Sequence, residues 1–259
     1  MKKLIALMTL VSMITFVGFA GNPKKKTAHK NAKTSTAVVV KVGEEHSYGE
    51  GLSTREYSVK TKNADIKVEY PVAGSPALVD AIRNYIKDKI NQKYTGSLSS
   101  PEDLIKSAVK ALDSGESINE EINVVFNGVH SISLKDTGYL NMKGAAHGMP
   151  WSTGKTFLKS NGNTFEISMF PPIEKFMSPI ATGLAQYLNV PISALKDEIF
   201  GWGTSEFAYP STVFLTNEGI ELIWEPYEIG PYSMGMPTVT IPATSENLKL
   251  LAPEAQSFF

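Results

Sequence analysis

Alternating apolar and polar residues predict most of the strands of this chain. In 57–60 and 66–70, Tyr, Val or Ile occupies every second position and the residues between them are polar, which is the period of a strand with one buried face. Asn161-Gly162 and Asn217-Glu218-Gly219 each separate two such segments and predict hairpin turns. We expect further strands at 36–42, 122–134, 139–142, 156–158, 165–167, 212–215, 220–224 and 238–241.

Two start signals predict a pair of helices. Ser75-Pro76 and Ser100-Pro101 each join a capping serine to a proline in the first turn, where its missing N–H needs no partner. Apolar residues follow at helical spacing in 78–90 and 104–112, and further helices are expected at 171–188, 191–199 and 246–251. Strands and helices come in runs rather than in strict alternation. The pattern therefore predicts an α+β fold, with mostly antiparallel sheets packed with helices in two small subdomains.

The first 20 residues have the order of a secretory signal peptide. Lys2 and Lys3 precede 17 uncharged residues, and Gly18 and Ala20 are the small residues expected just before a signal-peptidase cleavage site after Ala20. A retained anchor is the alternative, since about 17–25 apolar residues can span a bilayer. We expect an exported protein, periplasmic or secreted, with no transmembrane span after cleavage. Residues 21–50 are predicted to be a basic disordered linker, 51–140 an N-terminal subdomain and 141–259 a C-terminal domain.

Cysteine content and charge narrow the range of functions. The chain has no cysteine, which excludes disulfides, thiolate catalysis and cysteine-bound metals. Residues 44–259 contain 17 Lys and Arg against 26 Asp and Glu, a net charge of −9, whereas 21–43 contain six lysines and no acid. An acidic body argues against a nucleic-acid partner and favours a cationic one, although solubility alone would also explain it.

His147 is the histidine of most interest, because it lies in the small-residue run 144–148. It could be a structural hydrogen-bonding residue, a ligand contact, or a catalytic base or metal ligand, but a zinc site would need further ligands nearby. His130 is expected inside a strand, in a structural role. Glu225 and Glu228 are close in sequence, but residues three apart on a strand face opposite sides, so they are not expected to converge. We predict no catalytic residue, no metal and no cofactor.

The segment 224–237 is the densest in Tyr, Met, Pro and Gly, and it connects two predicted strands. Pro and Gly interrupt a strand ladder, while Tyr and Met offer large and adaptable contact areas. Besides His147, we predict ligand contacts from this segment by Tyr227, Pro231, Tyr232, Met234 and Met236. The alternative is that the aromatic residues close the end of the sheet as part of the core.

Several motifs occur together in a fixed order. They are Gly-Ala-Ala-His-Gly at 144–148, Thr-Gly-Lys-Thr-Phe at 153–157, the hairpin at 214–222, and Tyr-Glu-Ile-Gly-Pro-Tyr-Ser-Met-Gly at 227–235 followed by Val-Thr-Ile-Pro at 239–242. In these motifs the chain resembles the RsiV anti-sigma factor ectodomain family, which usually has Gly where Ala145 stands. The preceding segment resembles the companion domain also found in the PdaC peptidoglycan deacetylase. The resemblance spans about residues 55–255.

The resemblance implies an α+β fold without known catalytic residues. It also implies a receptor that binds lysozyme through surface loops, one of which carries Pro231 and Tyr232 here. Because a cytoplasmic sigma-binding segment is missing from this sequence, transmembrane signalling is not expected. We predict an exported, non-catalytic binding protein that recognises a lysozyme-like cationic cell-wall hydrolase or a peptidoglycan-derived ligand. A cell-wall hydrolase or deacetylase and an envelope scaffold protein are the alternatives.

Overall fold

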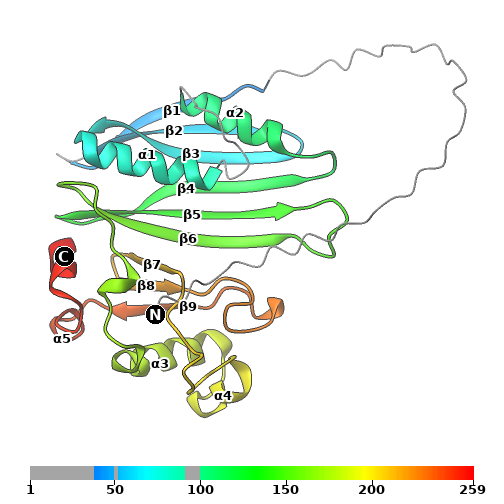
Figure 1. The fold of residues 1–259 in the computed structure, drawn as a ribbon. Coiled ribbons are helices and arrows are strands. Elements are labelled where there is room, and N and C mark those ends of the chain that lie inside the picture. The colour runs from blue at the N-terminus through cyan, green and yellow to red at the C-terminus, as the bar shows by residue number, and fades with distance from the viewer. Residues whose placement is uncertain (1–37, 50–51, 91–99) are drawn as a thin grey trace, which may run out of the picture. The chain divides into compact units, whose positions relative to one another are not determined.

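Among the residues that the structure describes, the larger sheet has six strands, whose order in space follows their order in the chain (Figure 1). The computed structural model describes residues 38–49, 52–90 and 100–259, and residues 37–259 form one unit. Neighbouring strands are antiparallel except for β3 and β4, which are parallel. The strands are β1 (Lys41–Ser47), β2 (Leu52–Lys60), β3 (Ala64–Gly74), β4 (Ser117–Asn127), β5 (Ser131–Asn141) and β6 (Met149–Leu158).

Two helices account for the parallel pair in this sheet. α1 (Pro76–Ile90) and α2 (Pro101–Ala111) lie between β3 and β4 in the chain and cover one face of the sheet (Figure 1). A crossover of this kind lets the next strand run in the same direction as the last. The predicted cap Ser100 accepts a hydrogen bond from the Asp103 N–H at 3.1 Å, which fixes the start of α2.

The N-terminal core fills the space between these helices and the sheet. Inward positions alternate along each strand, as Ile132 and Leu134 do on β5, and they meet the apolar face of α1. Ile82 and Ile86 on α1 are fully buried there. Phe157 on β6 is the last residue of this core in the chain.

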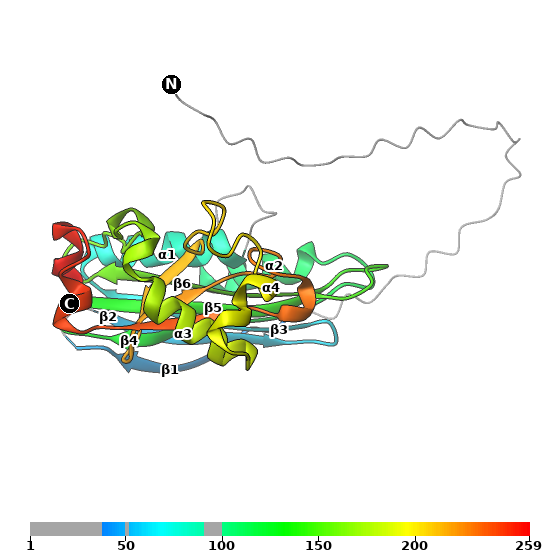
Figure 2. The ribbon, with the colours of Figure 1, turned by 90° about the horizontal axis from the view of Figure 1, so that it is seen from below.

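A smaller antiparallel sheet follows in the chain. It consists of β7 (Thr212–Leu215), β8 (Gly219–Ile223) and β9 (Thr238–Pro242). α3 (Met177–Leu188) packs on β9, and their side chains build the C-terminal core, in which Trp224 is 1% exposed. Figure 2, a view from below, places α3 and α4 (Leu195–Glu198) nearest the viewer. The remaining helices are α5 (Ser245–Leu248) and the 3₁₀ turns η1 (Ile167–Met169), η2 (Ile173–Lys175), η3 (Ile192–Ala194), η4 (Tyr232–Met234) and η5 (Pro253–Phe258).

Buried polar contacts join the two sheets. The Thr156 hydroxyl on β6 lies 2.8 Å from the Ser133 hydroxyl and accepts the Leu215 N–H of β7 at 2.8 Å, with Thr156 fully buried. Lys135 on β5 forms an ion pair with Glu221 on β8 at 2.8 Å. These bonds cross between the two cores, so they fix how β7 and β8 lie against β5 and β6.

The predicted α+β class with mostly antiparallel sheets is confirmed, and several local predictions are wrong. The expected strand 122–134 is two strands, β4 and β5, joined by a turn in which the Gly128 N–H donates to the Ser131 carbonyl. His130 therefore lies exposed in that turn and not in a strand. Residues 165–167 do not pair as the second arm of a hairpin, because the chain bends at Phe165 into the C-terminal core and enters η1.

The predicted segment boundaries also differ from the fold. β1 lies within 21–50, so the prediction of a disordered linker is wrong for Lys41–Ser47, where pairing with β2 orders the chain. The boundary between 140 and 141 falls inside the larger sheet, since β6 pairs with β5 across it. The predicted signal peptide and the linker up to residue 37 lie outside the described residues.

Candidate functional site

The connection between β8 and β9 starts with a folded-back turn. β8 ends at Ile223, and the Glu228 carboxylate accepts the backbone N–H groups of Glu225 at 2.6 Å and Ser211 at 3.1 Å. The segment is no longer a strand there, so Glu228 turns back onto the backbone of Glu225, while Glu225 itself lines the cavity described below. Tyr227 within this turn has a φ of 74°, in the left-handed region that bulky residues rarely adopt.

The same connection is then held close to the C-terminal core. The Met234 thioether packs on Gly230, where an added Cβ would lie 2.3 Å from the sulfur. Gly235 has a φ of 77° and lets the chain turn into β9. Met234 is half-buried against the C-terminal core, and Met236 is half-buried as well. The methionine side of the connection thus packs inward.

The tyrosine side of the connection contacts a second loop. The His147 and Tyr232 rings are stacked, with centroids 3.8 Å apart. The Tyr232 hydroxyl donates to the Gly148 carbonyl at 2.7 Å, and His147 Nδ1 lies 3.0 Å from the same oxygen. The Gly148 N–H donates to the Tyr139 hydroxyl at 3.1 Å, and Gly148 itself is buried under that ring. Loop 144–148 is therefore fixed between β5 and the connection.

The rings around these contacts form one exposed aromatic surface. Tyr227 lies beside Tyr232 with ring centroids 6.0 Å apart, and the Tyr187 hydroxyl of α3 donates to the Met234 carbonyl at 3.1 Å. Tyr227 is 54% exposed, Tyr187 43% and Tyr139 38%, and His147 and Pro231 are also exposed. We call the set Tyr139, His147, Tyr187, Tyr227 and Tyr232 the tyrosine patch.

An acidic cavity lies next to the patch, between helices α1 and α2 and the end of the larger sheet. It has a volume of about 480 Å³ and receives Glu120 from β4, Asp136 from β5 and Glu225 from the connection, together with Lys89 of α1. Glu120 stands opposite Gly138, two positions from Asp136, so both carboxylates project from the same face of the sheet. The cavity and the patch thus share the connection that begins at Glu225.

Hydrogen bonds hold two of the three carboxylates. The Trp151 indole N–H donates to Asp136 at 2.8 Å, and the Ser152 backbone N–H donates to Glu225 at 3.2 Å. The Trp151 ring can reach Asp136 because it lies over Gly138, where an added Cβ would be 2.1 Å from the ring. Gly138 is therefore required for the shape of the cavity.

Burial changes the acidity of these groups. It raises the pKa of Glu120 from 4.5 to about 8, with the neighbouring Asp136 adding to the effect and Lys89 opposing it. Burial also raises the pKa of Asp136, against the opposing effects of Trp151 and Lys89. The pKa of Glu225 is raised by burial too, although its bond from Ser152 lowers it. The cavity therefore disfavours ionised carboxyl groups.

Glu120 and Asp136 were not predicted as site residues from the sequence, although a signal was present. Glu120 stands between Ile118 and Ile122 at an inward position of a strand, and Asp136 continues the inward series of Ile132 and Leu134. An acid at such a position is rarely buried without a reason. The strand error at 122–134 hid this alternation.

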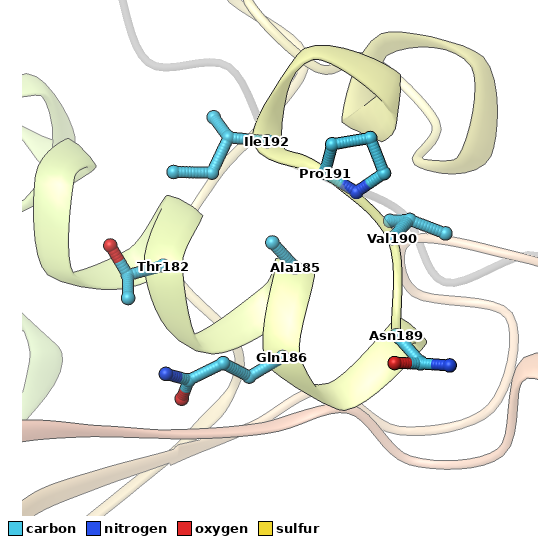
Figure 3. Close-up of a pocket in the computed structure, with 7 residues that line it drawn as sticks. All are labelled: Thr182, Ala185, Gln186, Asn189, Val190, Pro191 and Ile192. Atoms are coloured by element: carbon cyan, nitrogen blue, oxygen red, sulfur yellow. The ribbon is translucent and has the colours of Figure 1, made fainter.

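A second hollow, at the end of α3, has no ionisable group among the described residues that line it. Figure 3 shows its lining residues, one of which is the left-handed Asn189 at the end of the helix. They are Thr182, Ala185, Gln186, Asn189, Val190, Pro191 and Ile192. The tyrosine patch and the acidic cavity, which carry titratable and aromatic side chains, are therefore the stronger candidate sites.

Metal sites and membrane-spanning helices are both absent from the residues that the structure describes. No group of three or more His, Asp or Glu among them is placed so that it could hold a metal ion. No helix formed by them is long and apolar enough to cross a membrane.

The fold and the site define a class: an α+β protein with two sheets, an exposed tyrosine patch and an adjoining acidic cavity. Residues 174–244 match the family DUF3298, described as a protein of unknown function. This range runs from η2 to just beyond β9 and includes the whole connection.

Two solved structures share the fold. One is a DUF3298 family protein from Pseudomonas aeruginosa PAO1, with a TM-score of 0.54, and the other is a member of the same family from Bacteroides fragilis NCTC 9343, with a TM-score of 0.59. Each is 16% identical in sequence, and each alignment covers 85% of this chain and 96% of the other. At this identity the likeness shows the fold alone. No match was found among curated proteins. The relation to the RsiV ectodomain stays a prediction.

Proposed function

We propose that this chain is an exported, non-catalytic binding protein, and that the tyrosine patch holds a lysozyme-like cationic wall hydrolase or a peptidoglycan fragment. The observation that carries the proposal is the strained and exposed Tyr227 beside the stacked His147 and Tyr232 rings. Strained backbone persists where the surroundings enforce it, and such positions cluster at binding and catalytic sites. Tyr is also one of the residue types that most often anchor protein interfaces.

The patch is suited to contact because its rings are already in place. Two hydrogen bonds hold Gly148 between Tyr139 and Tyr232, so these rings lose little freedom when a partner binds. The exposed Tyr227 ring lies beside Tyr232 and supplies area at the edge of the patch. A preformed aromatic surface of this kind favours a partner with a complementary rigid face.

Charge supports a cationic protein as that partner. Residues 44–259 have a net charge of −9, which raises the rate of encounter with a basic protein and makes that rate sensitive to salt. The resemblance to the RsiV ectodomain family points in the same direction. The charge by itself selects no particular partner, so the experiment includes both a protein and a wall fragment.

Titration calorimetry of the full chain against lysozyme, and separately against a soluble muropeptide, tests the proposal. We expect one of them to bind, and Tyr227→Ala to weaken that binding by about 2 kcal/mol, or roughly thirtyfold. Val129→Ala is the matched control, because Val129 is 84% exposed but lies beyond the opposite end of β5 from Tyr139. The proposal would be overturned if neither probe gave heat up to millimolar concentration. It would also be overturned if Tyr227→Ala and Val129→Ala weakened binding equally.

Export belongs to the same proposal and has its own test. The order of basic, apolar and small residues in 1–20 supports it. N-terminal sequencing of the protein recovered outside the cytoplasm should begin at Gly21. Recovery only in the cytoplasm, starting at Met1, would contradict export.

A further inference from the structure

The acidic cavity contains one carboxylate that lacks a partner among the described residues. Glu120 is 3% exposed and lines the cavity, and within that part of the chain its side chain forms no hydrogen bond or ion pair. A buried carboxylate is normally hydrogen-bonded or paired, because removing its charge from water is very unfavourable. Asp136 and Glu225, by contrast, each accept an N–H. Glu120 is therefore the group in the cavity that is available to a ligand.

The charge balance of the cavity indicates the sign of that ligand. Among the described residues that line the cavity, three carboxylates, of Glu120, Asp136 and Glu225, face a single amino group, that of Lys89. Lys89 favours the ionised form of all three, but its nitrogen lies over the Tyr85 ring, 5.7 Å from the centroid. One lysine cannot neutralise three acids, so a further positive charge would be stabilised here.

The rest of the lining indicates the shape of the ligand. Apolar side chains form much of the wall, including Ile118, Leu140 and Met149, and the Trp151 ring lies beside the acids. An indole face attracts a cation, and apolar walls accept a hydrocarbon stem. The volume of about 480 Å³ falls in the range of about 300–1,000 Å³ that is typical of small-molecule sites.

We propose that this cavity binds a small organic cation, with an ammonium or guanidinium group directed at Glu120 and an apolar stem against Ile118, Leu140 and Met149. The proposal does not depend on the tyrosine patch or on its partner. Because the pKa of Glu120 is raised to about 8, a cation that pairs with its carboxylate at neutral pH replaces a proton, and binding releases that proton to the solvent. Lys89 competes with the ligand for the same carboxylates.

Calorimetry with three probes tests this proposal on the full chain. The probes are n-hexylammonium, n-butylguanidinium, and hexan-1-ol, which has the same stem as the first but no charge. We expect at least one of the cations to bind about tenfold or more tightly than the alcohol. Titrations at pH 7 in phosphate and in MOPS, which differ in ionisation enthalpy and supply no organic cation of their own, should show proton release. Equal affinity for the alcohol, or no heat with either cation up to about 10 mM, would overturn the proposal.

Variants then assign the site. Glu120→Gln should weaken cation binding about tenfold and abolish the proton release. Glu121→Gln, which changes the neighbouring exposed acid of β4, should leave both unchanged. Lys89→Met should tighten binding by a few fold, since it removes the competing charge. Undiminished binding and proton release by a folded Glu120→Gln protein would refute the assignment, and Tyr227→Ala should have no effect on these probes.

Discussion

Replacing Glu120 by Gln should flatten the pH dependence of stability. Burial raises the pKa of Glu120 from 4.5 to about 8, so the folded state holds this proton more tightly than the unfolded state does. A carboxyl group whose pKa is higher in the folded state stabilises the fold most at pH values below its pKa in the unfolded state. This stabilisation is lost as the pH rises toward the pKa of the folded state. This group alone should lower the free energy of unfolding by about 3–4 kcal/mol between pH 5 and pH 8.

Urea unfolding followed by tryptophan fluorescence at several pH values measures this effect. Glu120→Gln should match the parent protein near pH 5 and exceed its free energy of unfolding by about 3 kcal/mol at pH 8. The exposed neighbour Glu121 provides the control, since Glu121→Gln should follow the parent at every pH. Asp136 is also raised in pKa and remains in all three proteins, so some slope persists. Parallel curves for the parent and Glu120→Gln would refute the reasoning.

Three further predictions concern single contacts. Trp151→Phe removes the N–H donor to Asp136 and should lower the free energy of unfolding by about 2 kcal/mol. Because this donor stabilises the charged form of Asp136, urea unfolding should show a larger loss at pH 8 than at pH 5. Thr156→Val leaves the Leu215 N–H buried without an acceptor and should lower the free energy of unfolding in urea by about 2–3 kcal/mol, whereas Thr156→Ser should retain most of it. Tyr227→Gly should be about 1 kcal/mol more stable than Tyr227→Ala, because only Gly adopts a φ of 74° without strain; equal melting temperatures would contradict this.

Short sequence motifs correctly predicted turns and helix caps, because these features depend only on residues close together in the chain. The turn at 217–219 and the cap at Ser100 were correct because each is determined within a few residues. The unusual composition of 224–237 also drew attention to Tyr227, which is exposed, and to Tyr232, which is half-buried beside it. The stacking of Tyr232 on His147 was not predictable, since these residues are far apart in the chain and meet only when the two sheets pack.

The cavity required information that no single segment contains. Glu120 and Asp136 meet because β4 pairs with β5 in a register that sets Glu120 opposite Gly138. A slip of one residue would turn one of these acids to the other face of the sheet. Glu225 joins them from the connection that follows β8, which is a strand of the smaller sheet. The alternation of apolar residues around Glu120 could have shown that it is buried, but not which groups surround it.

The closeness of the two sites makes the choice of variants decisive. Loop 144–148 leads directly into β6, whose Met149 and Trp151 line the cavity, and the connection carries both Glu225 and Tyr232. A change at Tyr232 removes its bond to the Gly148 carbonyl and can therefore disturb both sites at once. Tyr227 and Glu120 avoid this ambiguity. Tyr227 is exposed and does not line the cavity, whereas Glu120 is buried and is not part of the tyrosine patch. Loss of protein or wall-fragment binding through Tyr227 alone, and of cation binding through Glu120 alone, would show that the chain has two independent sites.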